Sequence, residues 1–309
     1  MPEKEAVLLL AHGSPEKAED VPAFMMNITG GRPVSPETMQ EVAHRYDLIG
    51  RSPLLDHTRA QAQGLQRELG LPVYVGMRNW HPYIAEAVQQ MLRDGVTRAA
   101  AICLAPHNSR TSVGLYKKSA FAEAGDKIKL EFVESWHDHP LLIQAFVEKL
   151  EPAWEHMWEY THSKVPVIFT AHSVPRRTIE AGDPYEAQAK KTAALVAARL
   201  PEIKPWKFAF QSQGMSGGEW IGPTVIDTML ELEAGGHRAM LIQPVGFVCD
   251  HVEVLYDIDI GFQQFAHEQG IKLERTESLN ASPTFAAALA DLARKALAQT
   301  ASSLSRVKS

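Results

Sequence analysis

The chain has 309 residues, of which 45% are hydrophobic and 22% charged, and its formal net charge is −6. This composition is typical of a soluble globular protein, and the length accommodates two domains of ordinary size, each with its own core. The negative charge and the lack of a Lys/Arg cluster argue against a nucleic-acid partner.

The cysteine content and the hydropathy further limit the class of protein and its cellular compartment. Cys103 and Cys249 are the only cysteines and form no CxxC motif, which fits a reducing compartment and excludes a cysteine-ligated iron–sulfur cluster. The N-terminal sequence MPEKEAVLLLAHGS has an apolar core of about five residues, shorter than that of a secretory signal. No apolar run approaches the roughly 18 residues of a membrane span, so we expect a cytoplasmic protein without a transmembrane segment.

The first half of the chain alternates apolar runs with helical patterns. The run AVLLLA at 6–11 predicts a buried parallel strand that leads into His12. Residues 16–53 are polar and predict an irregular segment, apart from the helical PETMQEVAHRY. Further strands are predicted at 71–77, 98–106 and 128–134, and helices at 56–69, at 84–94 and around Tyr116.

The second half of the chain repeats the sequence pattern of the first. The strand-like VPVIFTAHSVP at 165–175 contains Ala-His-Ser after its apolar run, much as LLLAHGS at 8–14 contains Ala-His-Gly-Ser. Later strands are predicted at 206–210 and 239–245, and helices at 184–199, 222–234 and 283–299. The echo indicates two similar α/β halves that start near residue 1 and near residues 140–165, each with a doubly wound parallel sheet.

Ligands of doubly wound sheets bind beyond the carboxyl ends of the strands. The polar groups that follow apolar runs here are His12, His107, His172, the segment 211–213 and the segment 250–253. A histidine and a glutamate at such a site suit proton removal and metal handling, because imidazole titrates near neutrality and burial can tune a carboxylate. Structural roles for both His12 and His172 stay open at this point. The chain contains no HExxH, Walker or GxGxxG motif, which removes support for zinc hydrolase and nucleotide-binding functions.

The segment 241–259 carries a further group of candidate side chains. Its apolar positions fit an amphipathic helix that begins near Asp250, and the opposite face carries Asp250, Glu253 and Asp257. Their spacing would stack three carboxylates along one helical stripe. The alternative is a variant capping box, in which Asp250 and Glu253 satisfy free N–H groups at the start of the helix.

A series of segments in consistent order resembles the signature segments of the ferrochelatases, which insert ferrous iron into a porphyrin. The segments are YVGMRNWHP (74–82), LAPHNSRTSVGLYKK (104–118), ESWHDHP (134–140), TAHSVP (170–175), GDPY (182–185), QSQG with W-IGP (211–223), PVGFVCDHVEVLYDID (244–259) and ESLNASPTF (277–285). The resemblance implies an α/β fold of two Rossmann-like domains, 1–138 and 139–282, that face a porphyrin cleft. It also implies that the C-terminal helix, 283–309, packs back on the first domain.

The resemblance further implies that His172 and Glu253 are the paired catalytic residues and contact the metal. Two pyrrole N–H protons must leave as Fe²⁺ enters, and an imidazole beside a carboxylate can accept or relay them. Imidazole is also a competent iron ligand. Asp257 would continue an acidic path for protons or metal, a line that Ile260 and Gly261 then cut short.

The remaining implied contacts concern the porphyrin. His12 stands where relatives that use coproporphyrin often have tyrosine, so we expect it to contact the porphyrin and bind the metal from the face opposite His172. Arg45, Ser52 and Tyr116 fall where that branch contacts propionates, to which arginine and hydroxyl donors are suited. Trp220 is a further expected porphyrin contact. Thr29, in contrast, stands where that branch would have an arginine.

We therefore expect coproporphyrin III as the favoured substrate, with protoporphyrin IX as the alternative. Two other hypotheses stay open: a chelatase that loads cobalt or nickel into sirohydrochlorin-type rings, and a non-catalytic porphyrin or haem carrier of the same fold. No cofactor is expected beyond the substrate Fe²⁺, and no iron–sulfur cluster. The expected partners are the porphyrin and ferrous iron, with transient contacts to neighbouring haem-pathway enzymes.

Overall fold

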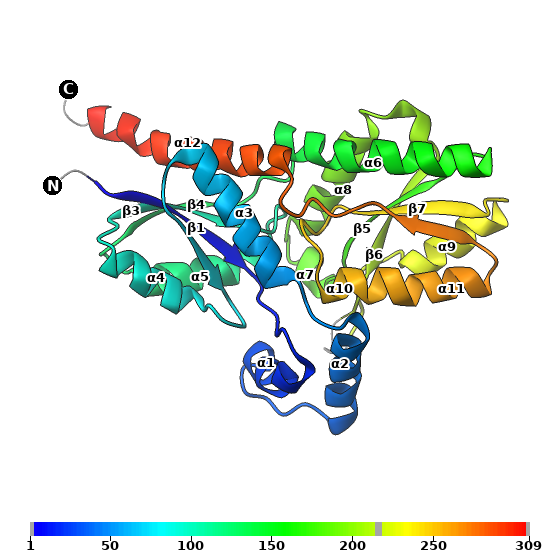
Figure 1. The fold of residues 1–309 in the computed structure, drawn as a ribbon, viewed down its shortest axis with the longest axis horizontal. Coiled ribbons are helices and arrows are strands. Elements are labelled where there is room, and N and C mark those ends of the chain that lie inside the picture. Colours follow the sequence, from blue (N-terminus) through cyan, green and yellow to red (C-terminus); the bar gives the residue numbers. More distant parts are fainter. Residues whose placement is uncertain (1–2, 214–217, 307–309) are drawn as a thin grey trace. The chain divides into compact units, whose positions relative to one another are not determined.

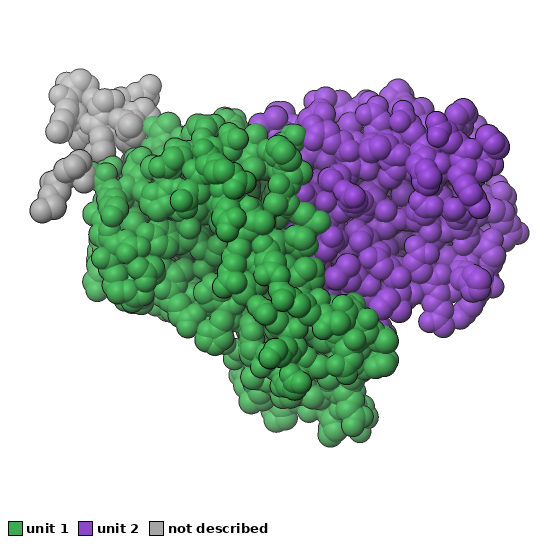
Figure 2. All heavy atoms as spheres, viewed as in Figure 1, with its two compact units in different colours: residues 1–136, 280–309 green, residues 137–279 purple. Residues whose placement is uncertain are grey.

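The computed structural model describes residues 3–213 and 218–306, with side chains as far as Ala298. The chain forms two compact units, one of residues 1–136 and 280–309 and the other of residues 137–279 (Figure 2). We call them unit 1 and unit 2. Their bounds lie within three residues of the predicted domain limits, and the C-terminal helix belongs to unit 1.

Unit 1 is built on a four-stranded parallel sheet in the order β2-β1-β3-β4 (Figure 1). The strands are β1 (Glu5–Ala11), β2 (Val73–Met77), β3 (Arg98–Cys103) and β4 (Lys129–Val133). Helices α4 (Ile84–Arg93) and α5 (Val113–Ala124) cover one face, and α3 (Leu54–Leu69) and α12 (Pro283–Arg306) cover the other. Because both faces are covered, the central strands β1 and β3 are continuous apolar runs rather than alternating ones.

The segment 16–53 corrects a prediction, because it is more regular than its polar composition indicated. It contains a 3₁₀ turn, η1 (Ala18–Asp20), and two helices, α1 (Val21–Thr29) and α2 (Pro36–Ile49). Helix α1 has proline in its first turn, buries Phe24 and Met25, and ends at Gly30 in the left-handed conformation. These local signals outweigh the polar composition.

Unit 2 repeats the architecture with the strand order β6-β5-β7-β8, again all parallel. Its strands are β5 (Val167–His172), β6 (Trp206–Gln211), β7 (Ala239–Pro244) and β8 (Lys272–Arg275). Helices α6 (Pro140–Thr161) and α8 (Tyr185–Ala197) pack on one face, and α9 (Val225–Ala234) and α11 (Gln263–Glu268) on the other. The short elements are α7 (Arg176–Glu180), η2 (Pro201–Ile203), α10 (Val252–Leu255) and the π-helical turn η3 (Asp257–Phe262).

The predicted fold class, two doubly wound parallel sheets, is confirmed. Strand β8 was not predicted, because KLER is a four-residue edge strand without an apolar run. Within the described ranges, no helix combines the length and apolar character that crossing a membrane requires.

Candidate active site

The site in unit 2 begins where β5, β6 and β7 end. His172 is the last residue of β5, Gln211 the last of β6, and Gly246 follows β7 by two residues. A Cβ atom on Gly246 would lie 2.6 Å from the Cα of Ala171, a distance that real contacts do not reach. Only glycine therefore lets the chain after β7 pass so close to the end of β5. This passage delivers the segment that starts α10 to the side of His172.

His172 and Glu253 form a direct pair. The Nε2 atom of His172 lies 3.4 Å from Oε1 of Glu253, and Nδ1 is hydrogen-bonded to the carbonyl of Ser173. Because a carbonyl oxygen only accepts, Nδ1 carries a hydrogen and Nε2 is the nitrogen that faces the carboxylate. The reactive nitrogen is therefore fixed by the backbone of the next residue.

The charge state of this pair follows from its neighbours. Burial alone would lower the pKa of His172, but the carboxylate of Glu253 outweighs this effect. With smaller contributions from the Ser173 carbonyl and Asp257, it raises the pKa to about 9. Burial would raise the pKa of Glu253, but His172 and then His251 hold it well below the ordinary range. The two side chains remain 28% and 38% exposed, so solvent has access to the pair and moderates both effects. At neutral pH the shared proton resides mainly on the imidazole.

A second histidine, His251, contacts the same carboxylate. Its Nε2 atom lies 3.4 Å from Oε2 of Glu253, and its Nδ1 atom lies 3.0 Å from the carbonyl oxygen of Cys249. The ring also packs against Phe247, with centroids 4.6 Å apart. Sequence analysis did not single out His251, although it lies two residues before Glu253 in the same motif. Each carboxylate oxygen of Glu253 thus faces one imidazole.

Buried polar side chains form hydrogen bonds to the backbone carbonyls of both His172 and Glu253. The amide of Gln211 donates to the carbonyl of Glu253 at 3.0 Å and accepts from the hydroxyl of Thr170 at 2.7 Å. The hydroxyl of Tyr185 donates to the carbonyl of His172 at 3.0 Å. These contacts tie the start of α10 to the carboxyl ends of β5 and β6.

The three acidic residues of this segment have different surroundings, which corrects the predicted stripe. Helix α10 begins at Val252, its N-cap His251 makes no side-chain capping bond, and Asp250 precedes the helix. Asp250 instead accepts from Ser278 at 2.7 Å and pairs with Arg275 at 3.2 Å. The capping-box alternative is therefore wrong, since Glu253 bonds to histidine rings and Asp250 to β8 and the residues after it.

Asp257 lies in the π-helical turn and accepts a hydrogen bond from Ser212. The carbonyl of Tyr256 accepts from the amides of both Ile260 and Gly261, at 3.2 and 2.9 Å, which marks the widened turn. Asp257 therefore lies close to the residue that follows β6.

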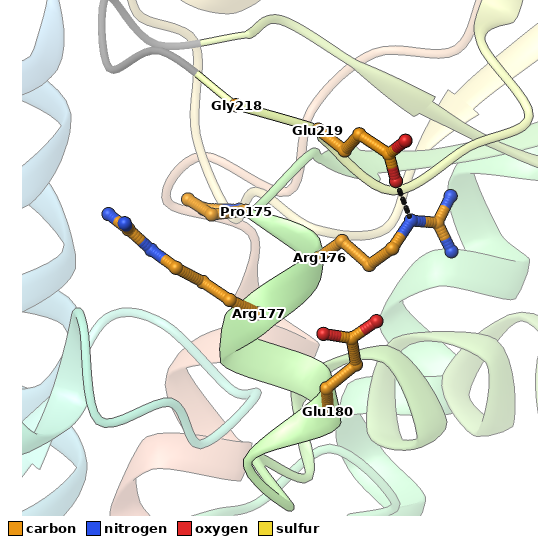
Figure 3. A pocket seen from close by; sticks show the side chains of 6 residues that line it. All are labelled: Pro175, Arg176, Arg177, Glu180, Gly218 and Glu219. Atoms are coloured by element: carbon orange, nitrogen blue, oxygen red, sulfur yellow. Dashed lines mark ion pairs between the residues drawn. The ribbon is translucent and has the colours of Figure 1, made fainter.

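Trp220 lies beside His172, with ring centroids 6.3 Å apart and an angle of 54° between the planes. It also forms an isolated antiparallel bridge with Pro175. Next to this bridge is a hollow of about 200 Å³, lined by Pro175, Arg176, Arg177, Glu180, Gly218 and Glu219 (Figure 3). Arg176 is paired with Glu219 at 2.9 Å, whereas the side chain of Arg177 extends away from that pair. The hollow is smaller than the roughly 300–1,000 Å³ of typical ligand sites, so it does not itself hold a large ligand.

Unit 1 contains the other predicted site residues. His12 follows β1 and is exposed; its ring nitrogens lie 3.2 Å from the amide nitrogen of Asn79, and the ring of Phe24 packs edge-on against it. Arg45, on α2, is paired with Glu41 at 3.1 Å and remains 39% exposed. Both side chains can therefore be reached from solvent.

Ser52, Tyr116 and Thr29 have structural contacts. Ser52 is buried and accepts from Ser14 at 2.6 Å. Tyr116 is 5% exposed, and the guanidinium of Arg78 lies 5.9 Å from its ring centroid. The hydroxyl of Thr29 donates to carbonyls near the end of α1, including that of Arg32 at 2.8 Å. The structure thus brings together His172, Glu253, Asp257 and Trp220 within unit 2 and places His12, Arg45, Ser52 and Tyr116 within unit 1.

The arrangement in unit 2 suits proton removal next to a divalent transition-metal ion. An imidazole nitrogen with a carboxylate at its side can take a proton, hold it, and release it to water, and the same nitrogen can bind a divalent transition metal. Within the described residues, no group of three or more His, Cys, Asp or Glu side chains is arranged to hold a metal ion.

Comparisons with known proteins agree with this chemistry. A family model described as Ferrochelatase matches residues 4–297. A protein of Acidobacterium capsulatum named Ferrochelatase is 54% identical over 311 residues, covering 96% of each chain. The Coproporphyrin III ferrochelatase of Bacillus subtilis is 36% identical over 305 residues, which cover 95% of this chain and 98% of the relative.

Similar solved structures show the same fold at low identity. SirB from Bacillus subtilis with Fe³⁺ has a TM-score of 0.62 and 13% identity, and the match covers 97% of this chain and 98% of the other. CbiX, described as the terminal enzyme for biosynthesis of sirohaem in denitrifying bacteria, has a TM-score of 0.54 and 12% identity and covers 94% and 98%. At such identities the likeness concerns the fold.

Proposed function

Since the chain belongs to the ferrochelatase family and inserts iron into a porphyrin, we propose that its substrate is coproporphyrin III and its product coprohaem. Several relatives, including that of Bacillus subtilis, carry the name coproporphyrin III ferrochelatase, whereas the Acidobacterium relative is named without a substrate. The partly exposed Arg45 supports the proposal, because a guanidinium on a helix surface can reach the propionates of a carboxylate-rich porphyrin.

The observation that carries the proposed mechanism is the pair formed by His172 and Glu253. Once the imidazolium has lost its proton, His172 accepts a pyrrole proton at Nε2 as Fe²⁺ enters the macrocycle, and Glu253 stabilises the imidazolium that forms again. Two protons leave for each ferrous ion, so the imidazole must release the first before it accepts the second. The partial exposure of both side chains supports release to water between the two steps.

Three further residues have supporting roles in this proposal. Asp257 receives protons or metal ions on the path that leads to Glu253, with its carboxylate oriented by Ser212. His12 is a metal ligand and porphyrin contact. Trp220 offers an aromatic surface beside His172 on which a macrocycle can stack.

The test is anaerobic insertion of Fe²⁺ with coproporphyrin III and protoporphyrin IX in parallel, followed by loss of the free-porphyrin absorbance. We expect a higher kcat/KM for coproporphyrin III, and Arg45→Gln should lower it for coproporphyrin III more than for protoporphyrin IX. A preference for protoporphyrin IX would contradict the substrate assignment. Tight haem binding without turnover of either porphyrin would instead indicate a carrier.

We also propose that the enzyme works in the cytoplasm, in transient contact with neighbouring haem-pathway enzymes. Cys103 and Cys249 are both buried free thiols, the state that a reducing compartment maintains. Fractionation of the native host, followed by an activity assay of each fraction, tests the location.

A further inference from the structure

Arg275, the last residue of β8, contacts two carboxylates of the active-site segment. Its Nε and one terminal nitrogen donate to the two oxygens of Asp259 at 2.7 and 2.8 Å, a bidentate pairing. The other terminal nitrogen lies 3.2 Å from Asp250 and donates to the carbonyl of Thr276 at 2.9 Å. One guanidinium therefore joins two residues that are nine positions apart in the chain.

The cluster is partly shielded from solvent. The side chain of Arg275 is 13% exposed, that of Asp250 18% and that of Asp259 35%. Charge-assisted hydrogen bonds are stronger in such surroundings than at an open surface, because water competes less for the donors and acceptors. The hydroxyl of Ser278 adds a bond to Asp250 at 2.7 Å.

Two carboxylates with proposed roles in metal insertion, those of Glu253 and Asp257, lie between the two contacts. Glu253 and Asp257 fall inside the segment 250–259, of which Arg275 holds both ends. Helix α10 has four residues and is followed by a π-helical turn, and helices this short have little stability of their own. The position of Glu253 therefore depends on contacts from outside the segment.

We propose that Arg275 is a positioning residue for metal insertion, and that it holds the segment 250–259 so that Glu253 faces His172 and Asp257 faces Ser212. The requirement is for arginine in particular. Its planar fork matches the two oxygens of Asp259 while leaving a nitrogen for Asp250, whereas the compact ammonium of lysine cannot make both contacts in the same geometry.

The inference rests on the proposed roles of His172 and Glu253, and the experiment measures metal insertion and porphyrin binding separately. Arg275→Gln should lower kcat and raise the KM for Fe²⁺, with a combined loss of about ten- to a hundredfold in kcat/KM, as expected when a contact that orients a metal-handling carboxylate is removed. The Kd for metal-free porphyrin, measured by fluorescence quenching, should stay within about twofold, because no porphyrin contact is removed. Arg275→Lys should recover only part of the loss, and Asp259→Asn should reproduce it in weaker form.

The matched control is Arg238→Gln, which removes an exposed ion pair with Glu233 in the same unit and should leave insertion unchanged. All rates are measured below the onset of unfolding and normalised to the folded fraction. Unchanged insertion in Arg275→Gln would overturn the inference, as would a parallel loss of porphyrin binding and insertion, which indicates a merely structural role. Full activity in His172→Ala would instead show that the proposed mechanism fails, whatever Arg275 does.

Discussion

At the scale of single residues, the chemistry depends on where one proton resides. The backbone carbonyl of Ser173 fixes the tautomer of His172, so that Nε2 faces Glu253 at 3.4 Å. The carboxylate makes His172 a stronger base than free imidazole, and the cost is that the imidazole must first lose its proton in the substrate-free enzyme. A higher pKa of His172 therefore gives a stronger base but a smaller fraction of unprotonated His172 at neutral pH.

This opposition predicts a pH dependence. Because neutral His172 is the proposed base and its pKa is raised to about 9, kcat/KM for the porphyrin should rise with pH between about 7 and 9. In Glu253→Gln the main raising influence is lost, so the pKa should fall toward its ordinary value of 6.5, and the acidic limb should move to lower pH. The maximal rate should also fall, by about 10²- to 10⁴-fold.

The measurement is anaerobic insertion in overlapping buffers of constant ionic strength. Glu180→Gln, which removes a carboxylate from the exposed end of α7, is the control and should keep the wild-type profile. An acidic limb that stays in place in Glu253→Gln would contradict the assignment of His172 as the titrating base.

Sequence analysis indicated both members of the pair and some neighbouring segments, but not the contacts that hold the pair in place. The motifs around His172 and Glu253 are specific enough to indicate both residues. In contrast, the bond from Gln211 to the carbonyl of Glu253 and the contact of His251 depend on how three strand ends and one turn come together. No local pattern encodes those distances, so the contacts of Gln211 and His251 with the pair emerged only from the structure.

At the scale of elements, the predictions succeeded where burial determines the sequence pattern of a strand or helix. They failed where a few specific contacts determine the geometry of a segment. The central strands were predictable because continuous apolar runs are required when helices cover both faces of a sheet. The segment after β7 was predicted to be a regular helix from Asp250, yet it is a four-residue helix followed by a π-helical turn. Its geometry is imposed by Gly246, Gln211 and Arg275, which lie outside the helical pattern.

Gly246 permits a testable prediction for this element. In Gly246→Ala the new Cβ would clash with the Cα and Cβ of Ala171, at 2.6 and 2.7 Å, so the chain after β7 must move away from β5. We expect a loss of about 1–3 kcal/mol in the free energy of unfolding, as for other overpacked sites, measured by urea denaturation. Insertion by the folded fraction should also fall, because Glu253 moves with the displaced segment.

The matched control is Gly114→Ala, a helical position at which a Cβ would lie 3.6 Å from the carbonyl oxygen of Ser109, an ordinary contact. This variant should be as stable as the wild type or slightly more stable, because alanine favours helices. Equal stability and activity in Gly246→Ala and Gly114→Ala would show that the close approach to Ala171 does not determine the path of the segment.

At the scale of the whole molecule, the two units share one topology. The order β2-β1-β3-β4 in unit 1 and the order β6-β5-β7-β8 in unit 2 both place the first strand of the unit second in its sheet and the third strand beside it. His12 follows β1 and His172 ends β5, so the repeated Ala-His motif marks the same place in both sheets. The echo in the sequence was therefore a sign of repeated architecture. The echo itself gives no sign that the C-terminal helix α12 belongs to unit 1.

The C-terminal helix α12 is fastened to unit 1 through a buried charge. Arg98, at the start of β3, is 5% exposed and donates to Glu5 at 3.0 Å and to the carbonyl of Leu297 at 2.5 Å. It also lies 3.4 Å from Glu131 on β4. One guanidinium thus links three strands of the sheet to the last helix.

Arg98→Met should therefore destabilise unit 1, since it leaves three acidic side chains, those of Glu3, Glu5 and Glu131, and a carbonyl without their shared donor. The expected cost is about 1–3 kcal/mol, the range for leaving a buried acceptor without its donor, because Glu5 and Glu131 are 33% and 21% exposed and can be hydrated. Urea denaturation measures it. Arg93→Met, which removes an exposed arginine bonded to Gln90, is the control and should shift the midpoint little. If both variants unfold at the same urea concentration, the packing of α12 on α3 and β3 holds the C-terminal helix without help from Arg98. Because the His172 and Glu253 pair lies wholly in unit 2, the porphyrin-free pair should keep its pH behaviour in the folded fraction of Arg98→Met.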